Sequence, residues 1–261
     1  MPSKLLRLEK KAGYAVLTLD NPPVNSLSAE MVAALDAAIE VIRCDNATKA
    51  LVIAGAGEKC FSAGANIKEF MSPDPGQTKS KNGLAVFLKL ERFPKPVIAA
   101  IQGNAFGGGL ELALSCHLRL AAEGIAFGLP EVKLGIIPGW GGTQRLSRLI
   151  GRSRALEMIL TGDPIDTRQA FDWGIVNRVF PKERLMAEVE SVAERMASGP
   201  SIAYRSILRA VIEGADTDLE SGLAIELRGS RDVFDSSDAK EGISAFIAKR
   251  LPHFSRTIDA G

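Results

Sequence analysis

Two glutamates in this sequence lie among apolar or glycine residues that would hold a carboxyl group away from water. Glu111 is part of the apolar run Leu110–Cys116, and Glu131 follows a proline in the glycine-rich stretch 128–142. Burial raises the pKa of a carboxyl, and two such groups in one apolar pocket suit general acid–base catalysis. Structural roles stay open, since Glu111 would also stabilise a helix N-terminus and Glu131 would also fit an exposed loop.

Glycines near these glutamates indicate backbone amides that could bind an anionic group. Gly107–Gly109 separate a strand-like run from the start of a helix, where N–H groups are free and a ligand can approach closely. In the segment 61–69, Asn66 and Glu69 resemble a capping box, which predicts a helix start and a free amide at Ala65. Two N–H donors from separate segments would form an oxyanion hole. Tight packing and an ordinary helix cap are the alternatives.

These glycines do not match a nucleotide-binding motif. A GxGxxG pattern starting at Gly107 would require glycine at position 112, where the chain has Leu112. The chain contains neither a P-loop nor a GxSxG motif, and its two histidines make a Ser-His-Asp triad a poor fit. The residues therefore favour acid–base chemistry at a carbonyl group.

Composition narrows the class of protein further. The 261 residues include 32 Lys and Arg against 31 Asp and Glu, and this net charge of +1 argues against a general nucleic-acid binder. The three cysteines are widely spaced and fit neither a disulfide framework nor a zinc site. We find no signal peptide and no apolar run of the roughly 20 residues that a membrane span needs. We expect a globular cytoplasmic protein that binds no membrane.

Alternating strand and helix patterns would position these groups. Continuous apolar runs predict buried strands at residues 14–19, 50–54, 96–101, 118–122 and 175–180. Helical patterns lie between them, which predicts an α/β fold with a parallel sheet covered on its faces. Beyond about residue 183 the patterns are helical only. We therefore expect an α/β core over residues 1–195 and a helical C-terminal region over 196–261.

The chain resembles the crotonase family of enoyl-CoA hydratases and isomerases over essentially its whole length. The matching segments are residues 21–28, 61–69, 99–113, 129–146 and 241–250. The resemblance implies a crotonase-like ββα spiral core with a helical C-terminal trimerisation region. It also implies a homotrimer or homohexamer that acts on acyl-CoA thioesters. No metal is implied, and no cofactor, because coenzyme A is part of the substrate.

The activity implied by the resemblance is hydration of trans-2-enoyl-CoA to 3-hydroxyacyl-CoA in the degradation of fatty acids or related acyl groups. Double-bond isomerisation on the same scaffold is the main alternative, alone or beside hydration, and Glu131 could suffice for it. RNA binding, known for at least one family member, is a remote alternative. It would need a basic helix face, and the arginines of residues 145–154 are interrupted by Gly151.

The resemblance also assigns roles to individual residues. Glu111 would act as base toward water and Glu131 would deliver the α-proton. The amides of Ala65 and Gly108 would form the oxyanion hole, and Gly139 would help to form the water site. The residues implied in coenzyme A binding are Lys59, Ala63, Ala65, Ile67, Phe246 and Lys249, the last two from the tail and across a subunit interface.

Three residues depart from the usual family pattern. Asn66 replaces an aspartate and can still cap a helix, and His117 replaces another aspartate, for which we expect a packed structural role. Trp140 lies between glycines where many relatives have a small residue. An indole there would shorten or reshape the acyl pocket and favour short or cyclic acyl chains. A role in packing alone is an equal alternative.

Overall fold

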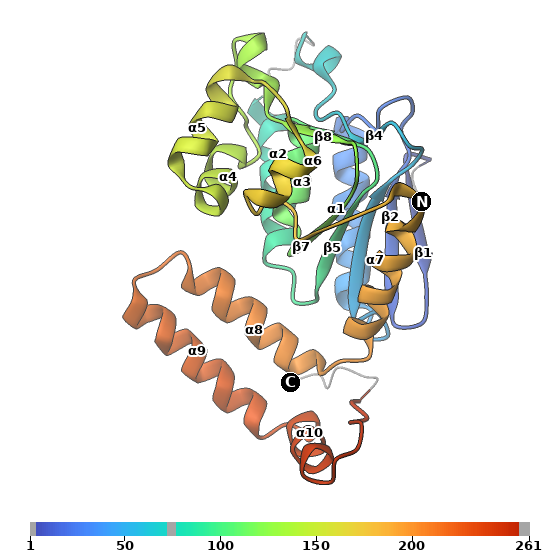
Figure 1. Cartoon of the computed structure of the whole chain (residues 1–261), viewed down its shortest axis with the longest axis vertical. Coiled ribbons are helices and arrows are strands. Elements are labelled where there is room, and N and C mark those ends of the chain that lie inside the picture. The colour runs from blue at the N-terminus through green and yellow to red at the C-terminus, as the bar shows by residue number, and fades with distance from the viewer. Residues whose placement is uncertain (1–3, 72–76, 256–261) are drawn as a thin grey trace.

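Two sheets form the core of the fold. The computed structural model describes residues 4–71 and 77–255. The larger sheet has the order β1 (Leu6–Lys10), β2 (Tyr14–Leu19), β3 (Ala50–Gly55), β5 (Val97–Ile101), β7 (Leu118–Ala122), β10 (Arg178–Phe180). Among the described strands of this sheet, the edge strand β1 pairs antiparallel with β2, and the other pairings are parallel. This arrangement confirms the parallel sheet expected from the apolar runs (Figure 1).

A smaller sheet is built from strands of two or three residues. Its order is β4 (Cys60–Ser62), β6 (Asn104–Phe106), β8 (Ala126–Gly128), β9 (Ile165–Asp166). The first three strands pair in parallel, and β9 is antiparallel to β8. The sequence patterns did not predict this sheet, because strands this short carry no periodicity.

The chain repeats a strand–strand–helix unit, which confirms the ββα spiral. In each unit the first strand joins the large sheet, the second joins the small sheet, and a helix returns the chain. The units are β3 and β4 with the 3₁₀ helix η1 (Ile67–Met71) and α2 (Gln77–Glu91), β5 and β6 with α3 (Gly108–Ser115), and β7 and β8 with the 3₁₀ helix η2 (Pro130–Leu134) and α4 (Gly142–Ile150).

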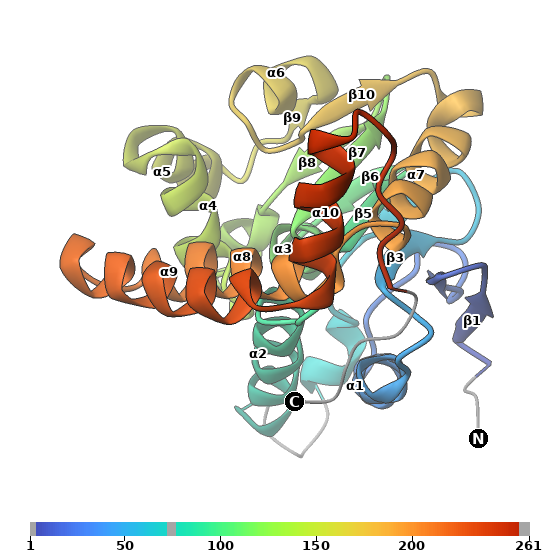
Figure 2. The same cartoon turned by 90° about the horizontal axis from the view of Figure 1, so that it is seen from below.

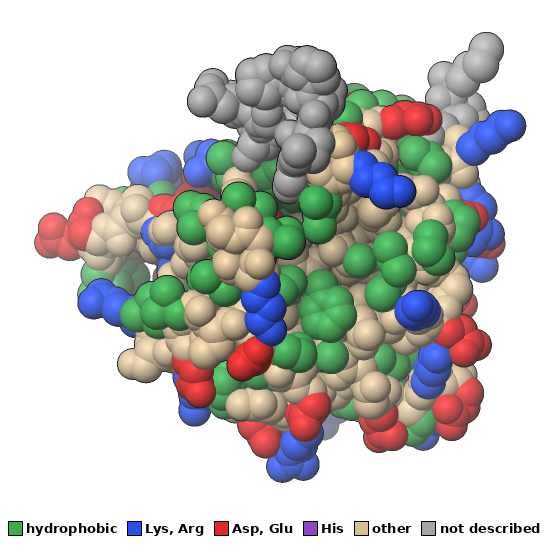
Figure 3. Space-filling view, turned by 90° about the horizontal axis from the view of Figure 1, so that it is seen from above, with side chains coloured by type: hydrophobic (Ala, Val, Ile, Leu, Met, Phe, Trp, Pro, Cys, Tyr) green, Lys and Arg blue, Asp and Glu red, His purple; other side chains and the backbone are tan. Residues whose placement is uncertain are grey.

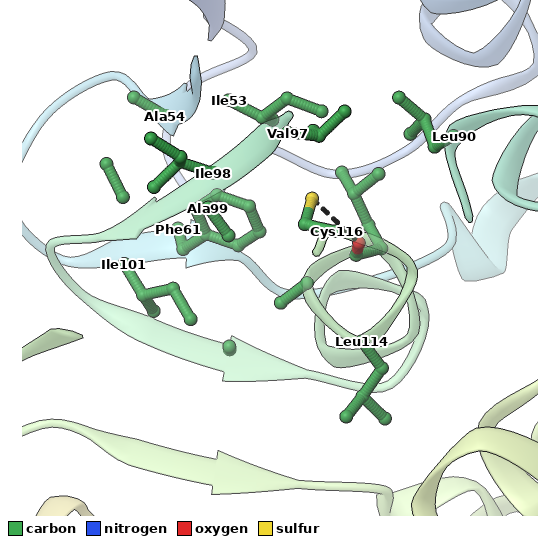
Figure 4. Close-up of a cluster of buried hydrophobic side chains, with 14 of the residues drawn as sticks. Ile53, Ala54, Phe61, Leu90, Val97, Ile98, Ala99, Ile101, Leu114 and Cys116 are labelled. Atoms are coloured by element: carbon green, nitrogen blue, oxygen red, sulfur yellow. Dashed lines mark hydrogen bonds between the residues drawn. The ribbon is translucent and has the colours of Figure 1, made fainter. Parts of the chain in front are cut away.

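Helix α3 is buried along its whole length. Every residue from Gly108 to Ser115 is buried, and the strand residues Ile98 and Ile101 are fully buried close by. Figure 4 shows these apolar side chains around Cys116, whose thiol donates a hydrogen bond to the carbonyl of Leu112 at 3.4 Å. The helix that carries Glu111 is therefore fixed by close packing on all sides.

The remaining helices cover the sheets or extend from them. They are α1 (Ala29–Cys44), α5 (Arg152–Thr161), α6 (Thr167–Asp172), α7 (Lys182–Ala197), α8 (Ser201–Gly214), α9 (Leu219–Phe234) and α10 (Ser237–Ile247). Figures 1 and 2 show α8 and α9 side by side as a hairpin that projects from the core. The expected domain division at residue 195 falls just before the end of α7 and stays a proposal. In the described ranges, no helix combines the length and apolar character needed to cross a bilayer.

Candidate active site

Three neighbouring strands bring the candidate site residues to one edge of the small sheet. Strands β4, β6 and β8 are parallel and adjacent, so their carboxyl ends meet at the same edge. Ala65 follows β4, Gly108 and Glu111 follow β6, and Glu131 follows β8. Four residues that are up to 66 positions apart in the sequence (131 − 65) are thus placed together by the topology.

The amide of Ala65 is left free by the way its neighbours are bonded. Leu27 donates to the carbonyl of Gly64 at 2.8 Å and accepts from the amide of Asn66 at 3.3 Å. This parallel bridge uses the groups that flank Ala65, so the N–H of Ala65 itself points to the other side. No hydrogen bond from it to another described residue is formed.

The amide of Gly108 lies close to this turn. It is in the first turn of α3, where an N–H has no partner within the helix, and it donates to no group in the described ranges. A methyl group added to Gly64 would lie 2.8 Å from the Gly108 nitrogen, and one added to Gly108 would lie 3.3 Å from the Ala65 nitrogen. Two free N–H donors therefore converge where glycines allow close approach.

Glu111 is held in place by a turn before α4. Its side chain is 2% exposed, and its Oε1 atom accepts hydrogen bonds from the amides of Trp140 and Gly142, both at 2.7 Å. Burial raises the pKa of Glu111, while these two amides and the charge of Arg145 oppose the rise. Oε1 is thus fixed by the protein, and the other carboxyl oxygen accepts no hydrogen bond from a described residue.

Glu131 lies on η2 with its carboxyl group against the start of α3. A methyl group added to Gly107 would lie 3.0 Å from Glu131 Oε1. Glu131 Oε2 is buried and has no hydrogen-bond partner in the described part of the chain. Burial raises the pKa of Glu131 to about 7, and the nearby charge of Glu111 contributes to the rise. Glu131 is therefore a carboxyl that can hold a proton near neutral pH.

Trp140 packs directly behind the Gly108 amide. A methyl group added to Gly108 would lie 2.5 Å from indole Cζ3, and one added to Gly83 would lie 2.4 Å from indole Cε2. The ring also meets Phe87 edge to face, with centroids 5.4 Å apart. Trp140 is 7% exposed and thus fills the space between α2 and the start of α3.

The residues implied in coenzyme A binding fall into two places. Lys59 is exposed beside β4, Ala63 is half-buried, and Ile67 is 53% exposed at the start of η1, so these three lie near the Ala65 turn. Phe246 is 85% exposed on α10 and Lys249 follows that helix. Figure 1 shows α10 at the opposite end of the molecule from β4, so one chain alone does not bring the tail to the site.

The end of the molecule that carries η1 and η2 is apolar. Hydrophobic side chains gather on this face, and Lys and Arg are dispersed among them (Figure 3). The exposed hydrophobic residues that follow β4 and β8 are Ile67, Val132, Leu134, Ile136 and Ile137. Gly139, implied in the water site, is exposed beside them. Within residues 4–71 and 77–255, no group of three or more His, Cys, Asp or Glu side chains could hold a metal ion.

The helix start expected at Asn66 is confirmed, since η1 begins at Ile67, but the capping box expected there is wrong. The segment forms a 3₁₀ helix of five residues, and the Asn66 side chain donates to Glu69 Oε1 at 3.1 Å. The other oxygen of Glu69 accepts from the amide of Ala29 at the start of α1, a contact 40 residues away. The capping box was the reason to expect a free amide at Ala65. In the structure this amide is free because the neighbours of Ala65 are bonded to Leu27.

Both ring nitrogens of His117 lie within hydrogen-bond distance of backbone groups. Its Nδ1 atom accepts from the amide of Val97 at 2.9 Å, and its Nε2 atom lies 3.0 Å from the carbonyl of Glu91. Nε2 therefore carries the hydrogen. Burial lowers the pKa of His117, so the ring stays neutral and joins α2 to β5.

Sequence reasoning missed the contacts of Arg145. Its Nη1 atom donates to the Trp140 carbonyl at 2.7 Å, and its Nη2 atom donates to Glu91 at 2.8 Å. In the sequence Arg145 was one arginine in an interrupted basic stretch, and Glu91 lies 54 positions away. No local pattern connects the two residues.

The ββα spiral, with two amides beside a buried and a half-buried carboxyl, has the arrangement expected of an enzyme that combines acid–base catalysis with an oxyanion hole. Comparisons with known proteins agree with this class. Residues 9–257 match the family model described as enoyl-CoA hydratase/isomerase. The chain belongs to this family.

Relatives and solved structures match nearly the whole chain. It is 39% identical to a short-chain-enoyl-CoA hydratase of Clostridium acetobutylicum, over 93% of this chain and 94% of the relative. It is 40% identical to a crotonyl-CoA hydratase of Syntrophomonas wolfei, over 95% and 96% of the two chains. The crystal structure of an enoyl-CoA hydratase from Bacillus anthracis matches with a TM-score of 0.92 and 37% identity, covering 96% of this chain and 99% of that one. These matches support the crotonase fold expected from the sequence.

Proposed function

We propose that the protein hydrates trans-2-enoyl-CoA thioesters to 3-hydroxyacyl-CoA. The observation that carries this proposal is the placement of the buried Glu111 and the half-buried Glu131, whose Oε2 atom is buried, beside the amides of Ala65 and Gly108, which bind no described residue. Hydration needs a base for water, an acid for the α-carbon and donors for the thioester oxygen. The four groups supply these three functions.

In the proposed reaction the thioester oxygen accepts hydrogen bonds from the amides of Ala65 and Gly108. Glu111 takes a proton from water as the water oxygen bonds to C3, and the electrons of the double bond move onto the thioester oxygen. The resulting enolate takes a proton at C2 from Glu131. Transfer of the proton from Glu111 back to Glu131 through solvent restores the starting state. Gly139 would line the water site, because it directly precedes the turn that binds Glu111.

Burial raises the pKa of both carboxyls, and the two differ in how their oxygens are bonded. Glu111 accepts two amide hydrogen bonds that favour the ionised form required of a base. Glu131 Oε2 lacks such donors, and its pKa of about 7 keeps a large fraction protonated near neutral pH. This difference supports Glu111 as the proposed base and Glu131 as the proposed acid.

We also propose that the substrates have short acyl chains. Trp140 fills the space between α2 and the oxyanion-hole residue Gly108, which leaves less room for an acyl chain on that side. The relatives named for short-chain-enoyl-CoA and crotonyl-CoA hydration are consistent with this limit.

The test is a spectrophotometric panel of trans-2-enoyl-CoA thioesters that differ in chain length and ring content. Wild type should remove the absorbance of the conjugated double bond, and Glu111→Gln should lower kcat by about 10²–10⁴-fold. Hydration that survives Glu111→Gln would refute this assignment. A 3-enoyl-CoA assayed beside the panel measures isomerisation, which Glu131 alone could catalyse and which Glu111→Gln would then spare.

A homotrimer or homohexamer would complete the coenzyme A site. Phe246 is on α10 and Lys249 directly follows it, and α10 lies at the opposite end of the chain from β4, so a second copy would have to supply these two residues. Exposed apolar side chains on the helical hairpin support such an assembly, and they include Ile207, Val211, Leu219, Leu223, Leu227 and Phe234. Light scattering would measure the assembly, while Lys249→Ala should raise KM for the thioester with little effect on kcat. The cytoplasmic location stays a prediction.

A further inference from the structure

The two amides that hold Glu111 belong to a short turn whose conformation is itself held. Trp140 and Gly142 direct their N–H groups to the same carboxyl oxygen, and Gly141 between them has a φ of +108°. Alternate residues whose N–H groups converge form an anion-binding nest. Such a nest binds well only if the backbone around it cannot relax.

Arg145 fixes this turn from the first residues of α4. Its guanidinium donates from Nη1 to the Trp140 carbonyl at 2.7 Å, on the same residue whose amide holds Glu111. A methyl group added to Gly141 would lie 2.1 Å from that Nη1 atom, so the arginine packs directly against the turn. The side chain of Arg145 is only 10% exposed, which makes the contact a built feature of the interior.

Glu91 in turn fixes Arg145. Its Oε2 atom lies 2.8 Å from Arg145 Nη2, and Glu91 is the last residue of α2. A planar guanidinium can bind a carboxylate and a carbonyl in fixed directions at once, whereas an ammonium group is a single point of charge. The chain of contacts runs from Glu91 through Arg145 and the Trp140 peptide to Glu111.

We infer that Arg145, held by Glu91, is a positioning residue for Glu111 and acts through the backbone of Trp140. The inference rests on the proposed function, in which Glu111 is the base toward water. The charged groups that act on Glu111 are Glu131 from η2 and Arg145 from α4. Loss of the guanidinium would let the turn relax, weaken both amide bonds to Oε1 and remove a positive charge near the carboxyl.

Arg145→Gln is the first test, with Arg148→Gln as the matched control. Arg148 lies on the same helix but is exposed, and its one hydrogen-bond partner within the described ranges is Gln144. We expect Arg145→Gln to lower kcat by about 10- to 100-fold, as outer-shell partners of an oriented group do, with KM nearly unchanged. The pH at which its kcat reaches the maximum should also rise, because a less stabilised Glu111 carboxylate stays protonated up to a higher pH. Arg148→Gln should match wild type in both respects.

Arg145→Lys and Glu91→Gln separate positioning from simple packing. Lysine keeps the charge but cannot bind Glu91 and the Trp140 carbonyl in the same geometry, so we expect partial rescue. Glu91→Gln should give a smaller loss of kcat of the same kind. If Arg145→Gln fails to fold because Glu91 is left unpaired, the double variant Glu91→Gln/Arg145→Gln removes both charges and carries the test.

A measurement without turnover distinguishes failure of this inference from failure of the proposed function. The carboxyl carbon of Glu111 can be followed by NMR titration in protein labelled at glutamate, with Glu111→Gln to assign the signal. A higher pKa of Glu111 in Arg145→Gln than in Arg148→Gln supports the inference even if no enoyl-CoA is hydrated. A folded Arg145→Gln with the same Glu111 titration and the same kcat profile as Arg148→Gln would overturn it.

Discussion

Leu27 hydrogen-bonds to both neighbours of Ala65 and leaves the Ala65 amide without a partner among the described residues. Ala65→Pro removes this N–H, and if the amide is an oxyanion-hole donor as proposed, its loss should lower kcat for hydration by about 10²–10³-fold. Ala65→Gly keeps the amide and is the matched control. Circular dichroism and thermal unfolding of both variants would show that the turn still folds. A folded Ala65→Pro with wild-type kcat would show that this amide does not bind the reacting oxygen.

The pH dependence of hydration should report the protonation of Glu131. Because burial raises the pKa of Glu131 to about 7 and the proposed reaction uses its proton, kcat/KM should fall about tenfold per pH unit well above pH 7. The measurement is kcat/KM for a short trans-2-enoyl-CoA between pH 5 and 9. A rate that stays constant up to pH 9 would contradict the role of Glu131 as the proton donor.

Protein stability should depend on the same carboxyl. The folded-state pKa of Glu131 is raised above its ordinary value of 4.5, so the folded protein binds more protons than the unfolded chain between pH 4.5 and about 7. The contribution of Glu131 is fully present below pH 4.5 and is lost as the pH rises through 7. Glu131→Gln does not titrate, so wild type should lose stability relative to it over this range in urea unfolding. If the free energies of unfolding of the two proteins changed with pH in parallel, the raised pKa of Glu131 would be excluded.

Trp140→Ala should change the acyl-chain preference. Removal of the indole opens space between Gly83 and Gly108, and burial of added methylene groups gains about 0.8 kcal/mol each. The ratio of kcat/KM for longer over shorter thioesters should therefore rise about tenfold for every two methylenes that the new space accepts. Trp140→Phe is the control, because a benzyl ring keeps contact with Phe87 and costs less than the roughly 3–5 kcal/mol of a Trp→Ala cavity. An unchanged chain-length profile in Trp140→Ala would assign the indole to packing alone.

Acid should destabilise the protein through His117. Burial lowers the pKa of His117 below its ordinary value of 6.5, so the unfolded chain binds more protons as the pH falls through this range. The stability that the neutral ring contributes is present above pH 6.5 and is lost below it. His117→Asn offers an acceptor to the Val97 amide without titrating. Wild type should therefore lose stability relative to His117→Asn on acidification, while kcat stays the same in both.

The large sheet and the proximity of the two candidate glutamates were easier to predict from the sequence than the small sheet and the contacts between distant residues. Long apolar runs such as residues 50–54 are recognisable because a covered parallel strand is apolar on both faces. The strands of the small sheet are too short to show a pattern, although Ala65, Gly108, Glu111 and Glu131 follow three of them directly. β10 begins at Arg178, three residues later than the apolar run suggested.

Contacts between distant residues explain what sequence reasoning missed at the site. Glu69 looked like part of a local helix cap, yet its carboxylate reaches Ala29. The pairing of Arg145 with Glu91 depends on where α2 and α4 meet, which no spacing along the chain indicates. Glu111 and Gly108 could be recognised as candidates from the sequence, because a carboxyl in an apolar helix and a glycine turn are unusual in themselves.

The free amides of Ala65 and Gly108 have a consequence for hydrogen exchange. Leu27 holds both sides of the Ala65 turn, so the Asn66 amide beside it is bonded while the Ala65 amide is not. In the unliganded protein the deuterium label should enter at Ala65 and Gly108 far sooner than at their bonded neighbours. The carbonyl oxygen of a bound thioester would accept hydrogen bonds from both N–H groups and slow exchange at these two positions together. Exchange rates at two backbone positions would thus report occupancy of the oxyanion hole with no turnover at all.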